Sequence, residues 1–386
     1  MTANINLPRI LRIGAGVSRQ LPEVLDELGL KQPLLVTDAF IVSLGWLDDL
    51  EAQLSKQGFV HNRFTGVVPD PTTDAITAGL AVLHLGEHDC VVALGGGSSI
   101  DTAKAIAAMA HRDQPMRNYK VPNTIDDGLP VIAIPTTAGT GSEVTRASVI
   151  TDTETQEKML CMGLGLMPIA ALVDFELTLS MPWRLTADTG LDTLCHALEA
   201  YVSKKANTFT DTIALAAMTA INTHIRTACQ LPDNRPAREA MMLAATQGGI
   251  AFSNASVTLI HGMSRPIGAL FHVPHGLSNA MLLPEITAWS ISGAPARYAD
   301  CARAMAMADA NDSDADANQK LIAGLRLLCR DLNVPTPSEF GIDAQLWQQS
   351  LPLMAQQALD SGSPNNNPRI PNAAEITGLY QKVWAN

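Results

Sequence analysis

An aspartate and three histidines in the second half of the sequence have the residue types and spacing to bind a metal ion. Asp192 and His196 are four residues apart in a stretch with helical spacing, which places both side chains on one face of a helix. His261 and His275 follow in the segments HGMSRPIG and FHVPHG. One carboxylate with three imidazoles suits Fe(II) or Zn(II) and matches Ca(II) and Mg(II) poorly, since these ions prefer oxygen ligands. Spacing does not choose between Fe(II) and Zn(II), and an aspartate–histidine pair alone is often an ordinary polar pair on a helix.

Two loops rich in glycine and hydroxyl groups, in the first half of the chain, are suited to holding phosphate. The loop GGGSSID follows an apolar run at 91–94, and PTTAGTGSE follows another at 131–134. Glycines allow a close backbone approach, and N–H groups at a helix N-terminus attract anions. Two such loops after successive strands would share the carboxyl edge of one sheet, where doubly wound proteins bind nucleotides. The candidate cofactor residues of these loops are Gly95, Gly96, Gly97, Ser98, Ser99, Asp101, Thr136, Thr137, Thr140 and Ser142.

Two charged residues outside these loops are candidates for the ribose. Asp38 ends an early apolar run, where its carboxylate can accept hydrogen bonds from an adenosine ribose and repel a 2′-phosphate, which favours NAD over NADP. Lys158 can donate a hydrogen bond to a ribose. The ordinary alternatives are a turn aspartate and a solvated surface lysine.

Composition excludes several classes of protein. The net charge of −12 disfavours nucleic acid as a partner, because it leaves no broad basic face to neutralise phosphates. The longest nonpolar run, 159–173, is too short for a membrane helix and is predicted to be buried core. No secretory signal is visible and the six cysteines contain no CxxC pair, so we expect a cytoplasmic protein with reduced thiols.

The order of the predicted elements indicates two domains. Short apolar strands alternate with amphipathic helices up to about residue 180, which predicts an α/β domain with a parallel sheet over 1–182. Long Ala-, Leu- and Met-rich helical segments then predict an all-α domain over 183–386, with the polar stretch 309–318 as a loop. A cleft between two such domains is the default place for chemistry.

Taken together, these motifs resemble those of the iron-containing (group III) alcohol dehydrogenases over essentially the whole chain. Besides the two loops, the similarity rests on TGLDTLCHALEAYVS, AFSNA, PHGLSNAMLLP and NPR. The resemblance implies the dehydroquinate synthase-like fold, with an N-terminal nucleotide-binding domain and a C-terminal helical metal and substrate domain. It also implies NAD, a divalent metal held by residues matching Asp192, His196, His261 and His275, and a homodimer or larger homo-oligomer.

The sequence departs from the family pattern at two places. Many members have a second histidine four residues after His261, where this chain has Arg265, so the proton relay differs or the arginine binds an anionic substrate group or a cofactor phosphate. The usual Asn-Pro-Thr near the adenosine is Asp-Pro-Thr here, and Asp70 adds negative charge that would further disfavour NADP. The candidate catalytic residues are therefore His272, Arg265 and Asp101.

The predicted function is hydride transfer between the carbinol carbon of a small alcohol, held at the metal, and nicotinamide, with an aldehyde as the oxidised product. The alternatives are a glycerol-dehydrogenase-like or dehydroquinate-synthase-like enzyme of the same superfamily, or a non-catalytic nucleotide-binding subunit. The four intact ligand residues favour the dehydrogenase.

Overall fold

The structure is a computed structural model that describes residues 2–385. The chain divides into two compact units. One unit is Asn6–Ser180, and the other is the described part of Met1–Ile5 and Met181–Asn386. The predicted combination of a parallel-sheet α/β part with an all-α part is confirmed.

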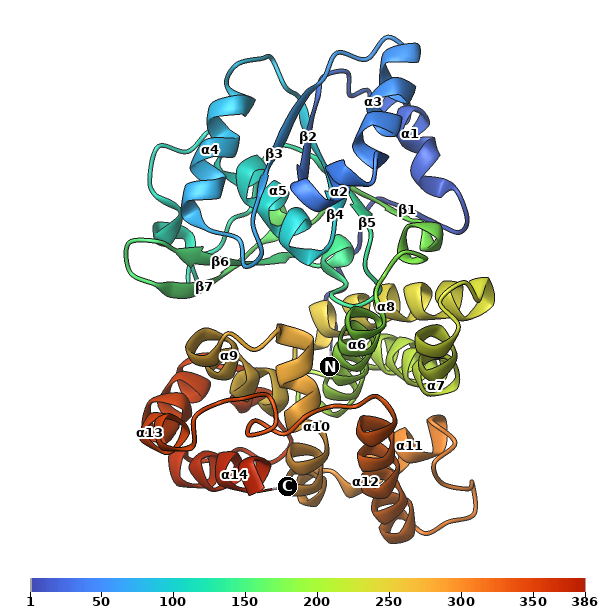
Figure 1. The fold of residues 1–386 in the computed structure, drawn as a ribbon, viewed down its shortest axis with the longest axis vertical. Helices are drawn as coiled ribbons and strands as arrows, with labels where there is room; N and C mark the ends of the chain where they lie inside the picture. Colours follow the sequence, from blue (N-terminus) through green and yellow to red (C-terminus); the bar gives the residue numbers. More distant parts are fainter. Residues whose placement is uncertain (1, 386) are drawn as a thin grey trace. The chain divides into compact units, whose positions relative to one another are not determined.

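A parallel sheet forms the centre of the N-terminal unit (Figure 1). Its strands, in spatial order, are β1 (Ile10–Ile13), β8 (Ala170–Val173), β5 (Val131–Pro135), β4 (Cys90–Gly95), β2 (Pro33–Asp38) and β3 (Asn62–Val67). Loops that follow β2, β4 and β5 therefore emerge at one edge of adjacent strands. An antiparallel hairpin, β6 (Ala147–Asp152) with β7 (Glu157–Met162), accompanies the sheet.

Helices cover both faces of this sheet because alternate strand residues point to opposite sides. Val91 and Ala93 of β4 pack in one core with α4 (Thr73–Leu83) and α5 (Gly97–Met109). Val92 and Leu94 pack in a second core with α1 (Leu21–Leu28) and α3 (Trp46–Lys56). The short helix α2 (Ala39–Ser43) directly follows β2.

The nonpolar run 159–173 differs from the prediction of continuous buried core. It comprises the end of β7, the 3-10 turn η4 (Leu164–Leu166) and β8. Leu164 is 51% exposed. Glycines at 163 and 165 break the run into separate elements, and only β8 is buried at every position.

The C-terminal unit is built from helices in the part of the chain that is described. They are α6 (Trp183–Val202), α7 (Thr208–Gln230), α8 (Arg235–Ala255), α9 (Leu259–Phe271), α10 (His275–Ser290), α11 (Pro295–Ala304), α12 (Asp314–Asp331), α13 (Ala344–Asp360) and α14 (Ala373–Ala385). Helix α6 is buried along nearly its whole length and packs against α7, α8 and α10. Among the described residues, no helix combines the length and apolarity needed to cross a membrane.

The remaining 3-10 turns connect these elements. They are η1 (Val17–Gln20), η2 (Met116–Tyr119), η3 (Ser142–Val144), η5 (Phe175–Thr178), η6 (Ile291–Gly293) and η7 (Ser363–Asn366).

Candidate metal centre and cofactor-binding loops

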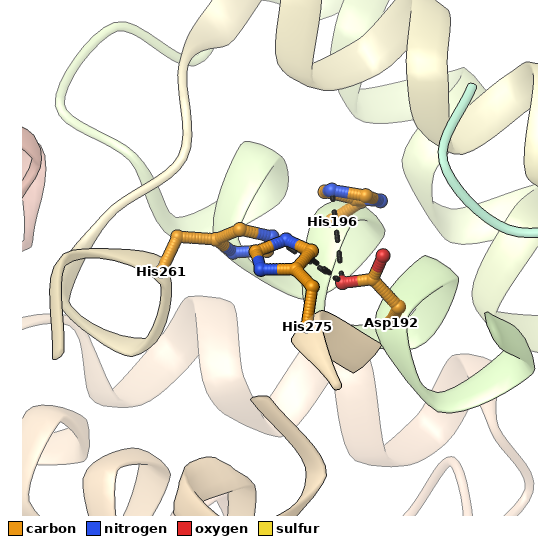
Figure 2. Close-up of side chains that lie close together, drawn as sticks. All are labelled: Asp192, His196, His261 and His275. Atoms are coloured by element: carbon orange, nitrogen blue, oxygen red, sulfur yellow. Dashed lines mark ion pairs between the residues drawn. The ribbon is translucent and has the colours of Figure 1, made fainter. Parts of the chain in front are cut away.

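Three helices of the C-terminal unit bring the four predicted metal ligands together (Figure 2). Asp192 and His196 come from successive turns of α6, His261 comes from α9, and His275 is the first residue of α10. One nitrogen or oxygen atom of each residue lies within 4.8 Å of those of the other three. Asp192 Oδ1 lies 3.5 Å from the Nε2 of His261, 3.7 Å from that of His275 and 3.9 Å from that of His196.

This donor set fits a divalent transition metal. Ligand atoms about 2.1 Å from a tetrahedral ion would be about 3.4 Å apart, and the three distances from Asp192 Oδ1, 3.5 to 3.9 Å, are close to that value. Asp192, His196 and His261 are buried, whereas the side chain of His275 is 50% exposed. The exposed side offers an approach for an additional, exchangeable ligand.

Glu199, one turn after His196 on α6, fixes the orientation of His261. Its Oε2 atom lies 2.5 Å from His261 Nδ1, and its Oε1 atom accepts hydrogen bonds from Thr258 Oγ1 at 2.7 Å and from the Ile260 backbone N–H at 2.6 Å. A proton on Nδ1 leaves the lone pair of the neutral imidazole on Nε2, which faces Asp192. A carboxylate that supports a metal-binding histidine in this way is a recurrent feature of metal sites.

Electrostatic interactions within the cluster shift its pKa values in opposite directions. Burial lowers the pKa of His196 to about 3, so this imidazole is neutral. Burial also disfavours the charged form of His261, but Glu199 and Asp192 outweigh it and raise the pKa of His261 to about 9. Burial raises the pKa of Asp192, and the three histidines more than reverse this, so the carboxylate is ionised.

Packing contacts hold the ligands in place. The ring of His196 stacks on Phe252 at a centroid distance of 4.3 Å and on His261 at 4.5 Å. Gly276 allows α10 to approach α6 closely, because a Cβ atom there would lie 2.4 Å from the backbone oxygen of Asp188. Any other residue at 276 would move His275 relative to Asp192.

The GGGSSID loop joins β4 to α5 and contacts the end of β2. Gly95 has φ +152°, and a Cβ atom there would lie 2.3 Å from Ser99 Oγ. Ser99 Oγ donates a hydrogen bond to Asp38 Oδ2 at 3.2 Å, while Asp38 Oδ1 caps α2 by accepting from the Ile41 N–H. Gly96 is the N-cap of α5, and Gly97 and Ser98 begin the helix.

The PTTAGTGSE loop packs directly against this first loop. A Cβ atom on Gly97 would lie 2.8 Å from Thr140 Cγ2, and one on Gly96 would lie 3.3 Å from Thr137 Cγ2. The Thr136 N–H donates to the Gly95 carbonyl at 3.0 Å. The two loops predicted to hold phosphate are therefore neighbours at one edge of the sheet.

A buried lysine that we did not predict supports the second loop. Lys104 Nζ donates hydrogen bonds to Ser142 Oγ at 2.9 Å and, each at 3.0 Å, to the hydroxyl and carbonyl of Thr145 and the carbonyl of Ala147. Ser142 Oγ in turn donates to Asp101 Oδ1 at 2.6 Å. Asp101 and Ser142 thus bind each other and fix the loop. The spacing of Asp101 and Lys104, three residues apart on α5, is the sequence signal that could have suggested that these two side chains lie together.

The other predicted site residues lie in different surroundings. Lys158 and Asp70 form an ion pair with each other at 3.0 Å. His272 is exposed at the C-cap of α9, with φ 55°, and is not part of the metal cluster. Arg265 is partly buried one turn after His261 and has neither a hydrogen bond nor an ion pair within residues 2–385. Burial lowers the pKa of Arg265, and Glu199 partly offsets this.

Comparisons with known proteins agree on one family for the whole chain. The family described as "Iron-containing alcohol dehydrogenase" matches residues 8–175, and "Fe-containing alcohol dehydrogenase family, C-terminal" matches residues 186–384. The 1,3-propanediol dehydrogenase of Klebsiella pneumoniae is 35% identical over 98% of this chain and 98% of its own length.

Two solved structures are similar over the whole chain. The crystal structure of a 1,3-propanediol oxidoreductase has a TM-score of 0.95 and 34% identity, covering 99% of this chain and 100% of the other. A sulfoacetaldehyde reductase from Bifidobacterium kashiwanohense, solved in complex with NAD+, has a TM-score of 0.90 and 27% identity, covering 100% of both chains.

Proposed function

The chain belongs to the iron-containing alcohol dehydrogenase family, and we propose that it catalyses the reaction alcohol + NAD+ ⇌ aldehyde + NADH + H+ with the aid of a divalent metal. The observation that carries this proposal is the convergence of one carboxylate and three imidazoles from α6, α9 and α10. We propose Fe(II) as the metal and Zn(II) as the alternative, since both accept this mixed nitrogen and oxygen set.

Asp192, His196, His261 and His275 would hold the metal, which when bound supplies Lewis acidity toward the substrate oxygen. The residues of the chain prepare this site. Glu199 holds a proton on Nδ1 of His261, so that Nε2, which faces Asp192, is the nitrogen that would bind the metal once its own proton is lost. Burial keeps His196 neutral, so its ring is a ligand and not a competing cation.

The two neighbouring loops would hold the dinucleotide. N–H groups at the start of α5, after Gly96, attract the pyrophosphate, and the close packing of the PTTAGTGSE loop places further N–H and hydroxyl groups beside them. Each oxygen of Asp38 accepts one hydrogen bond within the protein and retains capacity for another, from a ribose hydroxyl. The same carboxylate would repel a 2′-phosphate, which supports NAD over NADP.

Arg265 would select substrates that carry an anionic group. Its guanidinium is partly buried and forms no ion pair within residues 2–385, while the oxygens of the nearby Glu199 are already engaged by His261, Thr258 and Ile260. A substrate carboxylate or sulfonate would provide the missing partner. The similar protein named as a sulfoacetaldehyde reductase acts on an anionic aldehyde and supports this choice.

Two other predicted residues have supporting roles in this proposal. His272 is exposed, so it can exchange a proton with water. Asp101 holds Ser142 and accepts the Val149 N–H at 2.9 Å, so it would act on the cofactor by fixing the second loop. We also propose that the protein is cytoplasmic and that it forms a homodimer or larger homo-oligomer. Light scattering after gel filtration would test the oligomeric state.

The proposal is tested with metal-stripped protein that is reconstituted anaerobically with Fe(II) or Zn(II). NADH formation or consumption is followed across neutral alcohols, hydroxy acids and the matching aldehydes. We expect turnover only with metal, and a preference for anionic substrates that R265H abolishes. As a matched control, R326H changes an exposed arginine of α12 that is paired with Glu285 and should leave the preference intact.

Other outcomes would contradict parts of the proposal. Absence of turnover with either metal, despite NAD binding, would favour a lyase or a non-catalytic nucleotide-binding subunit. A zinc-dependent preference for glycerol would favour the glycerol-dehydrogenase-like alternative. Equal turnover of neutral and anionic substrates by the wild type would remove only the role given to Arg265.

A further inference from the structure

The side chain of Asn279 lies among the atoms that converge on the metal site. Asn279 is one turn after His275 on α10 and is fully buried. Its Nδ2 atom donates a hydrogen bond to Asp192 Oδ1 at 2.7 Å, and it lies 3.1 Å from His261 Nε2 and 3.3 Å from His275 Nε2. One amide nitrogen thus contacts donor atoms of three of the four ligand residues.

The chemistry of the cluster determines which end of the amide faces it. A carboxylate oxygen accepts hydrogen bonds, so the amide N–H group, and not the amide oxygen, faces Asp192 Oδ1 at 2.7 Å. The Oδ1 atom of Asn279 is buried and has no hydrogen-bond partner within the described residues. The contact with Asp192 is therefore made at the cost of an unsatisfied oxygen, which indicates that the amide N–H group is placed here for the cluster.

We propose that Asn279 is a positioning residue of the metal site, whose N–H group orients the ligand oxygen of Asp192. The ligand oxygen of Asp192 is also the atom that lies nearest the three imidazoles, at 3.5 to 3.9 Å. This inference rests on the proposed metal-dependent function.

Two substitutions together separate the effect of the hydrogen bond from the effect of charge. N279D keeps the shape, adds a negative charge and removes the N–H donor, whereas N279A removes the side chain beyond Cβ. If Asn279 acts as a donor, both changes weaken metal binding. If the site only gains from negative charge, N279D binds the metal more tightly.

Asn318 provides a matched control in the same unit. It is buried, its Nδ2 atom donates to the Pro295 carbonyl at 2.9 Å, and its Oδ1 atom has no hydrogen-bond partner among residues 2–385. N318D therefore makes the same chemical change at an asparagine that does not contact the metal ligands. Far-UV circular dichroism and thermal melting establish that each variant is folded.

The measurement is Co(II) binding to the metal-free full-length protein, followed by chelator competition and by the visible absorption bands of the bound ion. We expect the dissociation constant of N279D and N279A to rise by about 10- to 100-fold, with altered visible bands, and that of N318D to stay at the wild-type value. N279A decides the question if N279D does not fold. Wild-type affinity in a folded N279D would overturn the role of Asn279, whereas failure of the wild type to bind one equivalent of Co(II) would overturn the proposed function itself.

Discussion

Replacing Glu199 by glutamine tests whether the tautomer of His261 controls the metal site. Glu199 Oε2 contacts His261 Nδ1 at 2.5 Å, and Oε1 accepts from Thr258 and from the Ile260 N–H. In E199Q the amide oxygen satisfies Thr258 and Ile260, and the amide N–H group then faces Nδ1. A donor at this position favours the other tautomer, in which Nε2 carries the proton and has no lone pair for a metal.

The size of the effect follows from this geometry. Loss of a residue that supports a metal-binding histidine typically reduces metal affinity by about 10- to 100-fold, which corresponds to about 1.4–2.7 kcal/mol. Glu199 makes three hydrogen bonds at 2.5 to 2.7 Å and is 1% exposed, so we expect the upper part of this range.

Chelator competition with Zn(II) gives the dissociation constants of the wild type and E199Q. Activity at saturating metal distinguishes weaker metal binding from a defect in turnover. E285Q on α10 is a suitable control, because Glu285 is also largely buried but pairs with Arg326. A dissociation constant of E199Q within twofold of the wild type, in a folded protein, would refute the argument that Glu199 sets the tautomer.

Three further outcomes follow from the structure. D38G should raise kcat/KM with NADPH by about fivefold in steady-state assays, because it removes one charge repulsion of about 1 kcal/mol. G276A should lower the free energy of urea unfolding by about 1–3 kcal/mol and weaken metal binding, because the new methyl would overlap the Asp188 carbonyl. Burial lowers the pKa of Lys104 to about 8, so the unfolded chain keeps this proton to higher pH than the folded chain does. The stability of the wild type relative to K104M should therefore increase by about 1–3 kcal/mol between pH 7 and pH 10 in urea titrations, and an unchanged difference would contradict the shift.

Sequence patterns predicted the parts of the fold in which the residue types directly reflect burial in the structure. Runs at 91–94 and 131–134 are apolar at every position because both faces of β4 and β5 are covered, and this pattern is visible without the structure. The hairpin of β6 and β7 was not predicted. Its strands contain charged and polar residues, and their pairing depends on contacts distant in sequence.

The prediction that 309–318 is a loop was wrong for its second half. Helix α12 begins at Asp314, because Ser313 caps it by accepting from the Asp316 N–H at 3.1 Å. Aspartates in the first turn also interact favourably with the helix dipole. The serine followed by acidic residues was a visible capping signal, but the polar composition of the stretch concealed it.

The candidate site also contains some residues that a sequence pattern indicates and others that only their contacts in the fold reveal. The four candidate metal ligands could be selected from the sequence by residue type and spacing, whereas Glu199 and Asn279 have no distinctive pattern and reach the candidate site through contacts between α6, α9 and α10. Both are buried polar residues on helices, and such residues require partners that only the fold supplies.

The roles of charged residues were the hardest to predict, because they depend on which other charges the fold places beside them. We predicted that Asp70 adds negative charge near the ribose and that Lys158 donates to it, yet the structure pairs the two at 3.0 Å, so their charges cancel locally. Discrimination against a 2′-phosphate therefore rests on Asp38 in our proposal. Arg265 presents the opposite case, because burial disfavours its charge and Glu199 only partly compensates it. A guanidinium maintained under these conditions is best explained by a partner that arrives with the substrate, which is why the charge of the substrate is the property that the alcohol and aldehyde panel should vary first.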